Sequence, residues 1–279
     1  MKVYKGLSLG IEADFSFGNV ENSVTNQRAN VALATKYRET TNLRGGSVKF
    51  GAQYEHKLND KLIVNAGGTV KLGNSLDVTG ESLTYSLTFA GSGAEVVRDT
   101  LSQNGDKIIN IDGDFKLPIK SILGVGVGEF DKWYAGLEYE NQNAISTSAL
   151  LGNTTGAYRY GKSNRISLGG FYLPKVNSIS SYWERITYRA GLRYENTGLL
   201  VDGSGNNSNF TEIKDFGISF GLGIPLKRLS TLNMGFEFGK RGTIANNLIQ
   251  ENYFNFRLSL SLTDTCLLYT SPSPRDGLL

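Results

Sequence analysis

The chain has 279 residues and a formal net charge of only +3. It contains no block of lysine and arginine of the kind that neutralises phosphates, so a nucleic-acid partner is not expected. The single cysteine, Cys266, argues against a disulfide framework or a thiolate metal cluster, and no apolar run approaches the roughly 18 to 20 residues of a membrane-spanning helix. With 34 glycines, 14 tyrosines, 14 phenylalanines and five prolines, the composition favours strands separated by tight turns.

Apolar and polar residues alternate from the first predicted element onward. Residues 7–17 place apolar side chains on one strand face: Leu7, Leu9, Ile11, Ala13, Phe15 and Phe17. The positions between them are polar or glycine. The same period of two returns at residues 48–55, 186–195, 216–224, 232–239 and 254–262. Strict alternation of this kind predicts strands with one apolar face and one polar face.

About ten strands are predicted. They lie near residues 5–18, 43–58, 60–74, 114–129, 131–146, 157–173, 183–202, 210–227, 229–243 and 248–263. Many of them exceed the roughly ten residues that cross a bilayer. The strands are joined by short turns that alternate with long connections, which are residues 19–42, 75–113, 147–156 and 203–209. If parts of 30–41 or 81–90 extend hairpins, the count rises to twelve.

Short turns on one side and long loops on the other are typical of outer-membrane barrels. The sequence therefore predicts an all-β fold, an antiparallel transmembrane β-barrel of the bacterial outer membrane. One connection, residues 174–182, is of medium length although it falls on the side of the short turns.

Both ends of the chain differ from a complete outer-membrane protein. Met1 to Tyr4 lead directly into a strand without the apolar core of a secretory signal peptide. Either the signal peptide was removed or Met1 is an internal methionine of a longer chain, and truncation is the favoured interpretation. Residues 1–265 are expected to form the N-terminally truncated barrel. Residues 266–279 abandon the alternation and are expected to be a non-native tail, similar to a translated vector or adapter sequence.

Aromatic residues gather at two connections that should face the periplasm. They are Phe130, Trp133 and Tyr134 at one connection, and Tyr172, Tyr182 and Trp183 at the other. Aromatic side chains favour the level of the lipid headgroups, so these residues predict an aromatic girdle.

Charged residues on the polar strand faces are the candidate site. An arginine or lysine facing lipid near the midplane costs about 2–4 kcal/mol, so these side chains are expected to face the lumen. The lumen-facing candidates are Glu12, Asp14, Glu55, Arg189, Arg193, Glu195, Glu237 and Arg257. Ion pairs that stiffen the wall are the favoured interpretation, and a substrate path is the alternative.

Four segments near the end carry a family resemblance. They are residues 182–194 (YWERITYRAGLRY), 217–226 (GISFGLGIPL), 232–242 (LNMGFEFGKRG) and 250–254 (QENYF), and residues 116–134 also fit. They resemble the last strands of the long-chain fatty acid transporter (FadL/TodX-type) outer-membrane protein family. The resemblance implies a fourteen-stranded parent barrel with an N-terminal hatch, of which this chain would hold ten to twelve strands. The hatch motif around Asn-Pro-Ala is absent from this sequence.

The resemblance implies passive uptake of hydrophobic small molecules such as long-chain fatty acids. Its partners would be outer-membrane lipid and a hydrophobic small-molecule ligand, with no cofactor and no catalysis. The alternative is a non-enzymatic barrel component of secretion or surface attachment, similar to the barrel in type IX secretion, which would bind a secretion partner.

Material for an enzyme is scarce. His56 is the only histidine, so a barrel hydrolase or a histidine–metal site would have to be built around it. Asp112 and Asp114 alternate with glycine and are a weak candidate for calcium in an external loop, with solvated carboxylates as the favoured interpretation. The glycines between Gly124 and Gly128 share one strand face, which favours close packing over a phosphate-binding loop.

Overall fold

The computed structural model describes residues 2–102, 105–144, 146–147, 158–206, 208–226 and 230–261. The predicted tail at 266–279 and most of the connection at 147–156 lie outside these ranges. The first eight strands are β1 (Lys2–Tyr4), β2 (Leu7–Gln27), β3 (Leu33–Lys57), β4 (Leu62–Lys71), β5 (Asn74–Phe89), β6 (Glu95–Leu101), β7 (Ile109–Leu117) and β8 (Lys120–Glu129). The others are β9 (Trp133–Gln142), β10 (Ser146–Thr147), β11 (Tyr158–Tyr160), β12 (Ser163–Tyr172), β13 (Thr187–Asp202), β14 (Phe210–Pro225), β15 (Thr231–Gly242) and β16 (Gln250–Ser261).

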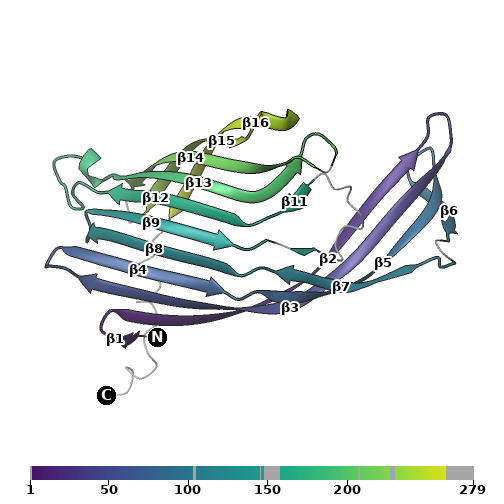
Figure 1. Cartoon of the computed structure of the whole chain (residues 1–279). Helices are drawn as coiled ribbons and strands as arrows, with labels where there is room; N and C mark the ends of the chain where they lie inside the picture. The colour runs from purple at the N-terminus through teal and green to yellow at the C-terminus, as the bar shows by residue number, and fades with distance from the viewer. Residues whose placement is uncertain are drawn as a thin grey trace, which may run out of the picture.

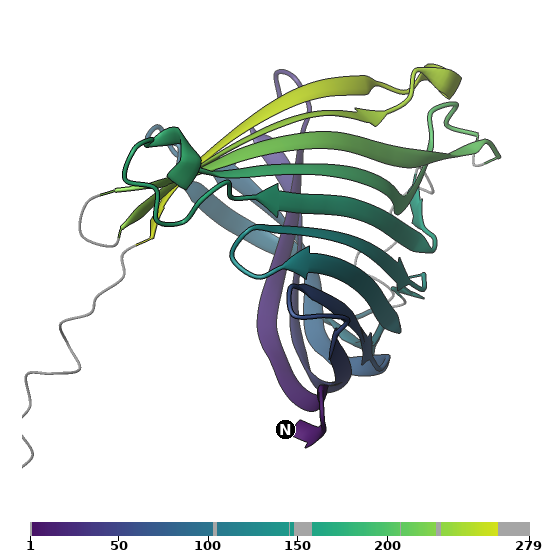
Figure 2. The ribbon, with the colours of Figure 1, turned by 90° about the vertical axis from the view of Figure 1, so that its left-hand side faces the viewer.

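All of these strands belong to one antiparallel sheet, which confirms the all-β prediction (Figure 1). Neighbouring strands follow the chain as an up-and-down meander. Four pairs of consecutive strands each form one path across the sheet, because both members of a pair lie against the same neighbouring path: β4 with β5, β7 with β8, β9 with β10, and β11 with β12. Without the short β1 and the added strand β6, the described residues form ten long paths across the sheet, which is the number predicted. Figure 2 shows that the sheet is strongly curved. Within the described residues no pairing joins β2 to β16, so the sheet is open.

The pairing register gives the sheet two distinct faces. One row across the middle runs through apolar residues of consecutive strands: Tyr54, Ala66, Val125, Leu137, Leu168, Leu192, Ile218, Phe238 and Phe254. On the same face, the side chains of Leu123 and Leu258 are 61% and 60% exposed. Such a continuous exposed apolar surface is the one that an outer-membrane sheet turns to lipid.

The aromatic residues at the short-turn end form a row on the apolar face. Trp133 pairs with Tyr172, and Tyr172 pairs with Tyr188. We call these three residues the aromatic belt. Tyr134, which was predicted to belong to the same girdle, lies on the opposite face because successive strand residues point to opposite sides.

The predicted long loops at 19–42 and 75–113 are mostly strands, so that part of the prediction was wrong. Beyond the apolar face, β2 and β3 stay paired from Gly18–Leu43 to Gln27–Ala34, and β5, β6 and β7 add to them. These segments, residues 18–27, 33–44, 74–101 and 109–117, are called the extension; the remaining strands form the wall. Figure 1 shows the extension leaning away from the wall. Their Asn, Thr and Ser content suggested loops, but regular cross-strand pairing prevails over composition.

The extension buries side chains that the wall does not. Ala34, Tyr85 and Leu87 form a buried apolar cluster against which Leu83 packs. On the other side of β3, the hydroxyl of Tyr37 donates a 2.8 Å hydrogen bond to the buried Glu39. Burial, followed by this hydrogen bond, raises the pKa of the Tyr37 phenol above its usual value. The extension therefore has the small core expected of a sheet in water.

Two short 3-10 helices complete the described structure: η1 (Trp183–Arg185) and η3 (Ala245–Asn247). None of the helices in the described ranges has the length and apolar character needed to cross a membrane.

Candidate functional site

All eight predicted site residues lie on the polar face of the sheet. Their positions follow from the register, in which Glu55, Arg193 and Glu237 alternate with apolar neighbours on their own strands. Their assignment to a lumen stays a prediction. On the polar face, the strand pairing divides these charged residues into separate clusters.

The largest cluster is centred on Arg193 of β13. Its guanidinium lies 3.0 Å from Glu237, 3.4 Å from Glu195 and 3.4 Å from Asp215. It also donates a 2.9 Å hydrogen bond to the hydroxyl of Tyr253. Four neighbouring strands, β13 to β16, are thus tied together through one side chain.

Asp215 is the fully buried acceptor of this cluster, although it was not among the predicted site residues. Its carboxylate receives Arg241 Nε at 2.6 Å and the Tyr253 hydroxyl at 2.8 Å, in addition to Arg193. Its side chain is 0% exposed. Arg257, the last predicted member, reaches the cluster only through Glu237, at 3.7 Å. A buried carboxylate that accepts hydrogen bonds from two arginines and a phenol holds the neighbouring strands in a fixed position.

A second cluster joins β2, β3 and β4. Glu12 forms an ion pair with Lys49 at 2.6 Å, and Asp14 forms one with Lys71 at 2.9 Å. Glu55 lies apart from both clusters on the same face.

Arg189 also lies outside these clusters. It donates a 2.9 Å hydrogen bond to Asn233 rather than forming part of them.

A third cluster was not predicted at all. Arg165 of β12 lies 2.7 Å from Glu140 and 3.7 Å from Glu138, and Lys120 lies 2.8 Å from Glu140. The alternation of β9 and β12 would have revealed three of these charges, since Glu138 and Glu140 alternate with Leu137 and Tyr139, and Arg165 comes directly before the apolar Ile166. Opposite charges on adjacent strands stabilise the pairing register.

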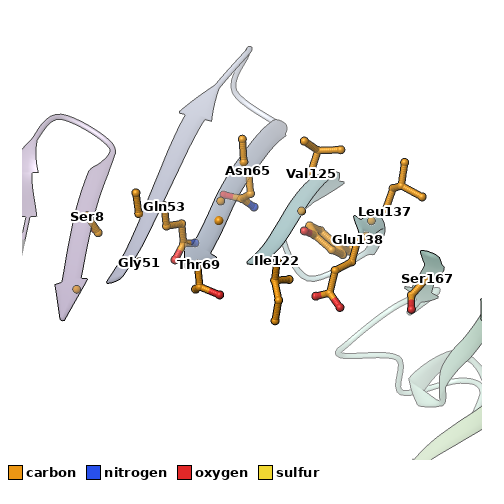
Figure 3. Close-up of a pocket in the computed structure, with 18 of the residues that line it drawn as sticks. Ser8, Gly51, Gln53, Asn65, Thr69, Ile122, Val125, Leu137, Glu138 and Ser167 are labelled. Atoms are coloured by element: carbon orange, nitrogen blue, oxygen red, sulfur yellow. The ribbon is translucent and has the colours of Figure 1, made fainter. Parts of the chain in front are cut away.

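The polar face is hollowed by a groove of about 800 Å³ across β2, β3, β4, β8, β9 and β12. Glycines make up much of its floor: Gly10, Gly51, Gly67, Gly124, Gly136 and Gly169. Polar side chains stand among them, including Gln53, Asn65 and Thr69. In Figure 3, Glu138 and Ser167 point to one side of the sheet, whereas Val125 and Leu137 point to the other.

Several glycines of the polar face make room for aromatic rings. A Cβ atom on Gly126 would collide with the ring and hydroxyl of Tyr134, and a Cβ on Gly239 would collide with the ring of Tyr253. Tyr253 can reach Arg193 and Asp215 because Gly239 of β15 and Gly217 of β14, which lie beneath its ring and hydroxyl, have no side chains. The close packing expected for Gly124 to Gly128 is therefore found at Gly126, against a ring from the next strand.

The residues weighed for catalysis or metal binding do not converge. His56 Nδ1 lies 3.5 Å from the hydroxyl of Tyr54, and their rings stack on the apolar face. Asp112 and Asp114 lie in β7 and not in a loop, and Asp114 accepts a 3.1 Å hydrogen bond from Ser75. Over the ranges that the structure describes, no group of three or more His, Cys, Asp or Glu is placed to hold a metal ion.

Two solved structures share the fold at low sequence identity. One is described as the RagAB peptide transporter, with a TM-score of 0.52, 14% identity and coverage of 95% of this chain. The other is the RagAB peptide importer in the "closed-closed" state, with a TM-score of 0.50, 13% identity and coverage of 93% of this chain. The chain spans only about a third of their length, 33% and 32%. A comparison with curated proteins finds no match.

The family comparison matches BamG over residues 1–267. It overturns the resemblance to the long-chain fatty acid transporter family, which was wrong. The segments that carried this resemblance alternate apolar residues with glycine and charge, and that pattern is common to outer-membrane strands in general. The match and the β-sheet identify an outer-membrane β-barrel-related protein. Because the match spans nearly the whole sequence, the chain belongs to the BamG family.

Proposed function

We propose that this protein is a non-enzymatic subunit of the outer-membrane assembly machinery, in which the sheet forms part of a barrel wall. The observation that carries the proposal is the family match over residues 1–267, since the name BamG points to that machinery. The apolar face would contact outer-membrane lipid.

The chemistry of the polar face supports a structural role. Arg193 forms ion pairs with Asp215 and Glu237 across three strands, β13 to β15, and Arg165 of β12 forms one with Glu140 of β9. Charges that are paired in this way brace a wall, and they leave little binding energy for a charged substrate. The sequence has a single histidine, His56, and its side chain contacts the hydroxyl and ring of Tyr54 rather than a serine, which supports a non-enzymatic role.

The proposal is tested in the native bacterium with the full-length protein carrying an affinity tag. We expect the protein to copurify from detergent-solubilised outer membranes with the central barrel-inserting subunit of the machinery, identified by mass spectrometry. Depletion should lower the amount of folded outer-membrane barrels, measured by their heat-modifiable migration. Absence of the machinery from the purified material, together with normal barrel assembly after depletion, would show that the proposal is wrong.

A further inference from the structure

The connection between β12 and β13, residues 173–186, differs from the other connections at its end of the sheet. The β3–β4 and β8–β9 connections there are residues 58–61 and 130–132. Figures 1 and 2 show the longer connection projecting at the strand ends, with η1 inside it. Long connections that retain a defined conformation beside tight turns are often functional.

This connection, here called the β12–β13 loop, is fixed by hydrogen bonds to its neighbours. The amide of Leu173 donates to the carbonyl oxygen of Lys132 at 2.6 Å. The Tyr182 hydroxyl donates to the carbonyl oxygen of Pro225 at 2.7 Å. Inside the loop, the amide of Lys175 donates to the carbonyl oxygen of Glu184 at 2.8 Å. The loop is therefore tied to the β8–β9 turn on one side and to the end of β14 on the other.

The fixed loop presents apolar side chains to its surroundings. Ile179 is fully exposed at 103%, and Trp183 is 70% exposed. Val176, in the same loop, is exposed as well. Ser178 and Ile186 are buried, so the loop has an inner side and an outer side. An ordered apolar projection of this kind marks an interaction site.

Lipid is a poor occupant for this projection. The chain leaves the aromatic belt at Tyr172 and returns to it at Tyr188, so the loop lies on the turn side of the belt. Since aromatic belts sit at the headgroup level, Ile179 is placed on the aqueous side of the membrane surface. A fully exposed apolar side chain there lies outside the hydrocarbon layer, which favours another protein over lipid as the group that covers it.

We propose that the β12–β13 loop docks a protein subunit located at the short-turn side of the membrane, with Ile179 inserted into an apolar pocket of that subunit. Lys175 of the same loop is also exposed, and its positive charge favours a carboxylate at the rim of the partner's pocket. The inference rests on the proposed function, because the subunit is taken to be a member of the outer-membrane assembly machinery.

The test uses the tagged full-length protein in native membranes and compares two exposed apolar residues at the same end. Ile179→Asp should lower recovery of the machinery about tenfold or more, as expected when a central apolar anchor is lost. Leu58→Asp, at a residue 60% exposed on the tight β3–β4 turn, should leave recovery unchanged. Both side chains are exposed, so neither change should prevent insertion, which is checked by heat-modifiable migration.

The outcomes separate the two proposals. If the unmodified protein fails to recover the machinery, the proposed function fails and the docking inference fails with it. If the unmodified protein recovers it and Ile179→Asp recovers as much, only the docking inference is overturned. A photo-cross-linking amino acid at position 179 should give an adduct with a subunit of the machinery. An adduct with lipid or with a second copy of this chain would overturn the inference.

Discussion

The wall and the extension share strands β2 and β3, yet they bury different kinds of side chain. Strand β3 passes through both: Phe50, in the wall, is exposed on the apolar face, whereas Ala34, in the extension, is buried. Among the described residues of the wall strands, the largest fully buried side chain is a carboxylate, Asp215, on the polar face. In the extension, apolar side chains such as Leu87 and Val78 are buried together with a few polar ones, such as Thr41.

This difference reflects the solvent on each side. A wall in lipid turns its apolar residues outward, so its internal packing must come from polar groups, glycines and aromatic rings. An extension in water follows the ordinary rule and collects apolar residues inside. The two regions should therefore respond differently to the same kind of substitution.

The largest effect is expected from Asp215→Ala in the wall. It leaves Arg193 and Arg241 on the polar face without their shared buried carboxylate, and breaking a buried ion pair costs about 3–5 kcal/mol. The free energy of unfolding of the inserted protein should fall by that amount in urea titrations in lipid vesicles.

The matched control is Glu12→Ala, which removes an exposed pair with Lys49 and should cost less than about 1 kcal/mol. Equal losses from the two substitutions would mean that Asp215 is no more than another surface charge.

Leu87→Ala tests the core of the extension. Removal of a fully buried leucine costs about 2–5 kcal/mol, and here the loss should stay local. Hydrogen exchange should quicken for amides of β5 and β6 and stay unchanged for β13 to β16. Leu258→Ala on the apolar face, 60% exposed in the absence of lipid, serves as the comparison and should leave the exchange of β5 unaffected. Quickened exchange throughout the wall would contradict the division into two regions.

Sequence periodicity was sufficient to find the strands but not their partners. Alternation places Arg193 and Glu237 on a polar face because each lies between apolar neighbours. Asp215 escaped notice because it stands at the end of the alternating run, before Phe216, and its importance comes from three other strands. Such cross-strand relations depend on the register, which a single strand does not contain.

The extension and the family were missed for a related reason. Residues 19–42 are rich in Asn, Thr and Ser, as loops are, but continuous pairing from Asn19–Asn42 onward makes them strands. The family resemblance rested on features that many outer-membrane strands share, such as Gly221, Leu222 and Gly223 in alternation. Local patterns therefore identified the class of protein and misidentified the family.

Glycine packing in the wall gives a smaller expected effect. Gly126→Ala would force the Tyr134 ring to move, and overpacking of this kind costs about 1–3 kcal/mol. Gly10→Ala is the matched control, because a Cβ atom there has nothing within 4 Å. Urea titrations in vesicles should separate the two variants. If Tyr134→Ala removes most of the loss caused by Gly126→Ala, the ring is the cause; if the loss persists, the account is incorrect.

The smallest effect is a pH dependence confined to the extension. Burial and the hydrogen bond to Glu39 raise the pKa of Tyr37 above its usual value of 10.0. A group whose pKa is higher in the folded state contributes stability that is complete below its unfolded pKa and is lost as pH rises through the folded pKa. Hydrogen exchange of β3 and β5, corrected for the intrinsic rate, should therefore show lower protection above about pH 10. Tyr37→Phe should remove this change, since phenylalanine does not titrate, while the protection of β14 and β15 stays the same in both proteins. A persistent loss of protection in Tyr37→Phe would assign the pH dependence to another group and would remove Tyr37 from the polar interior of the extension.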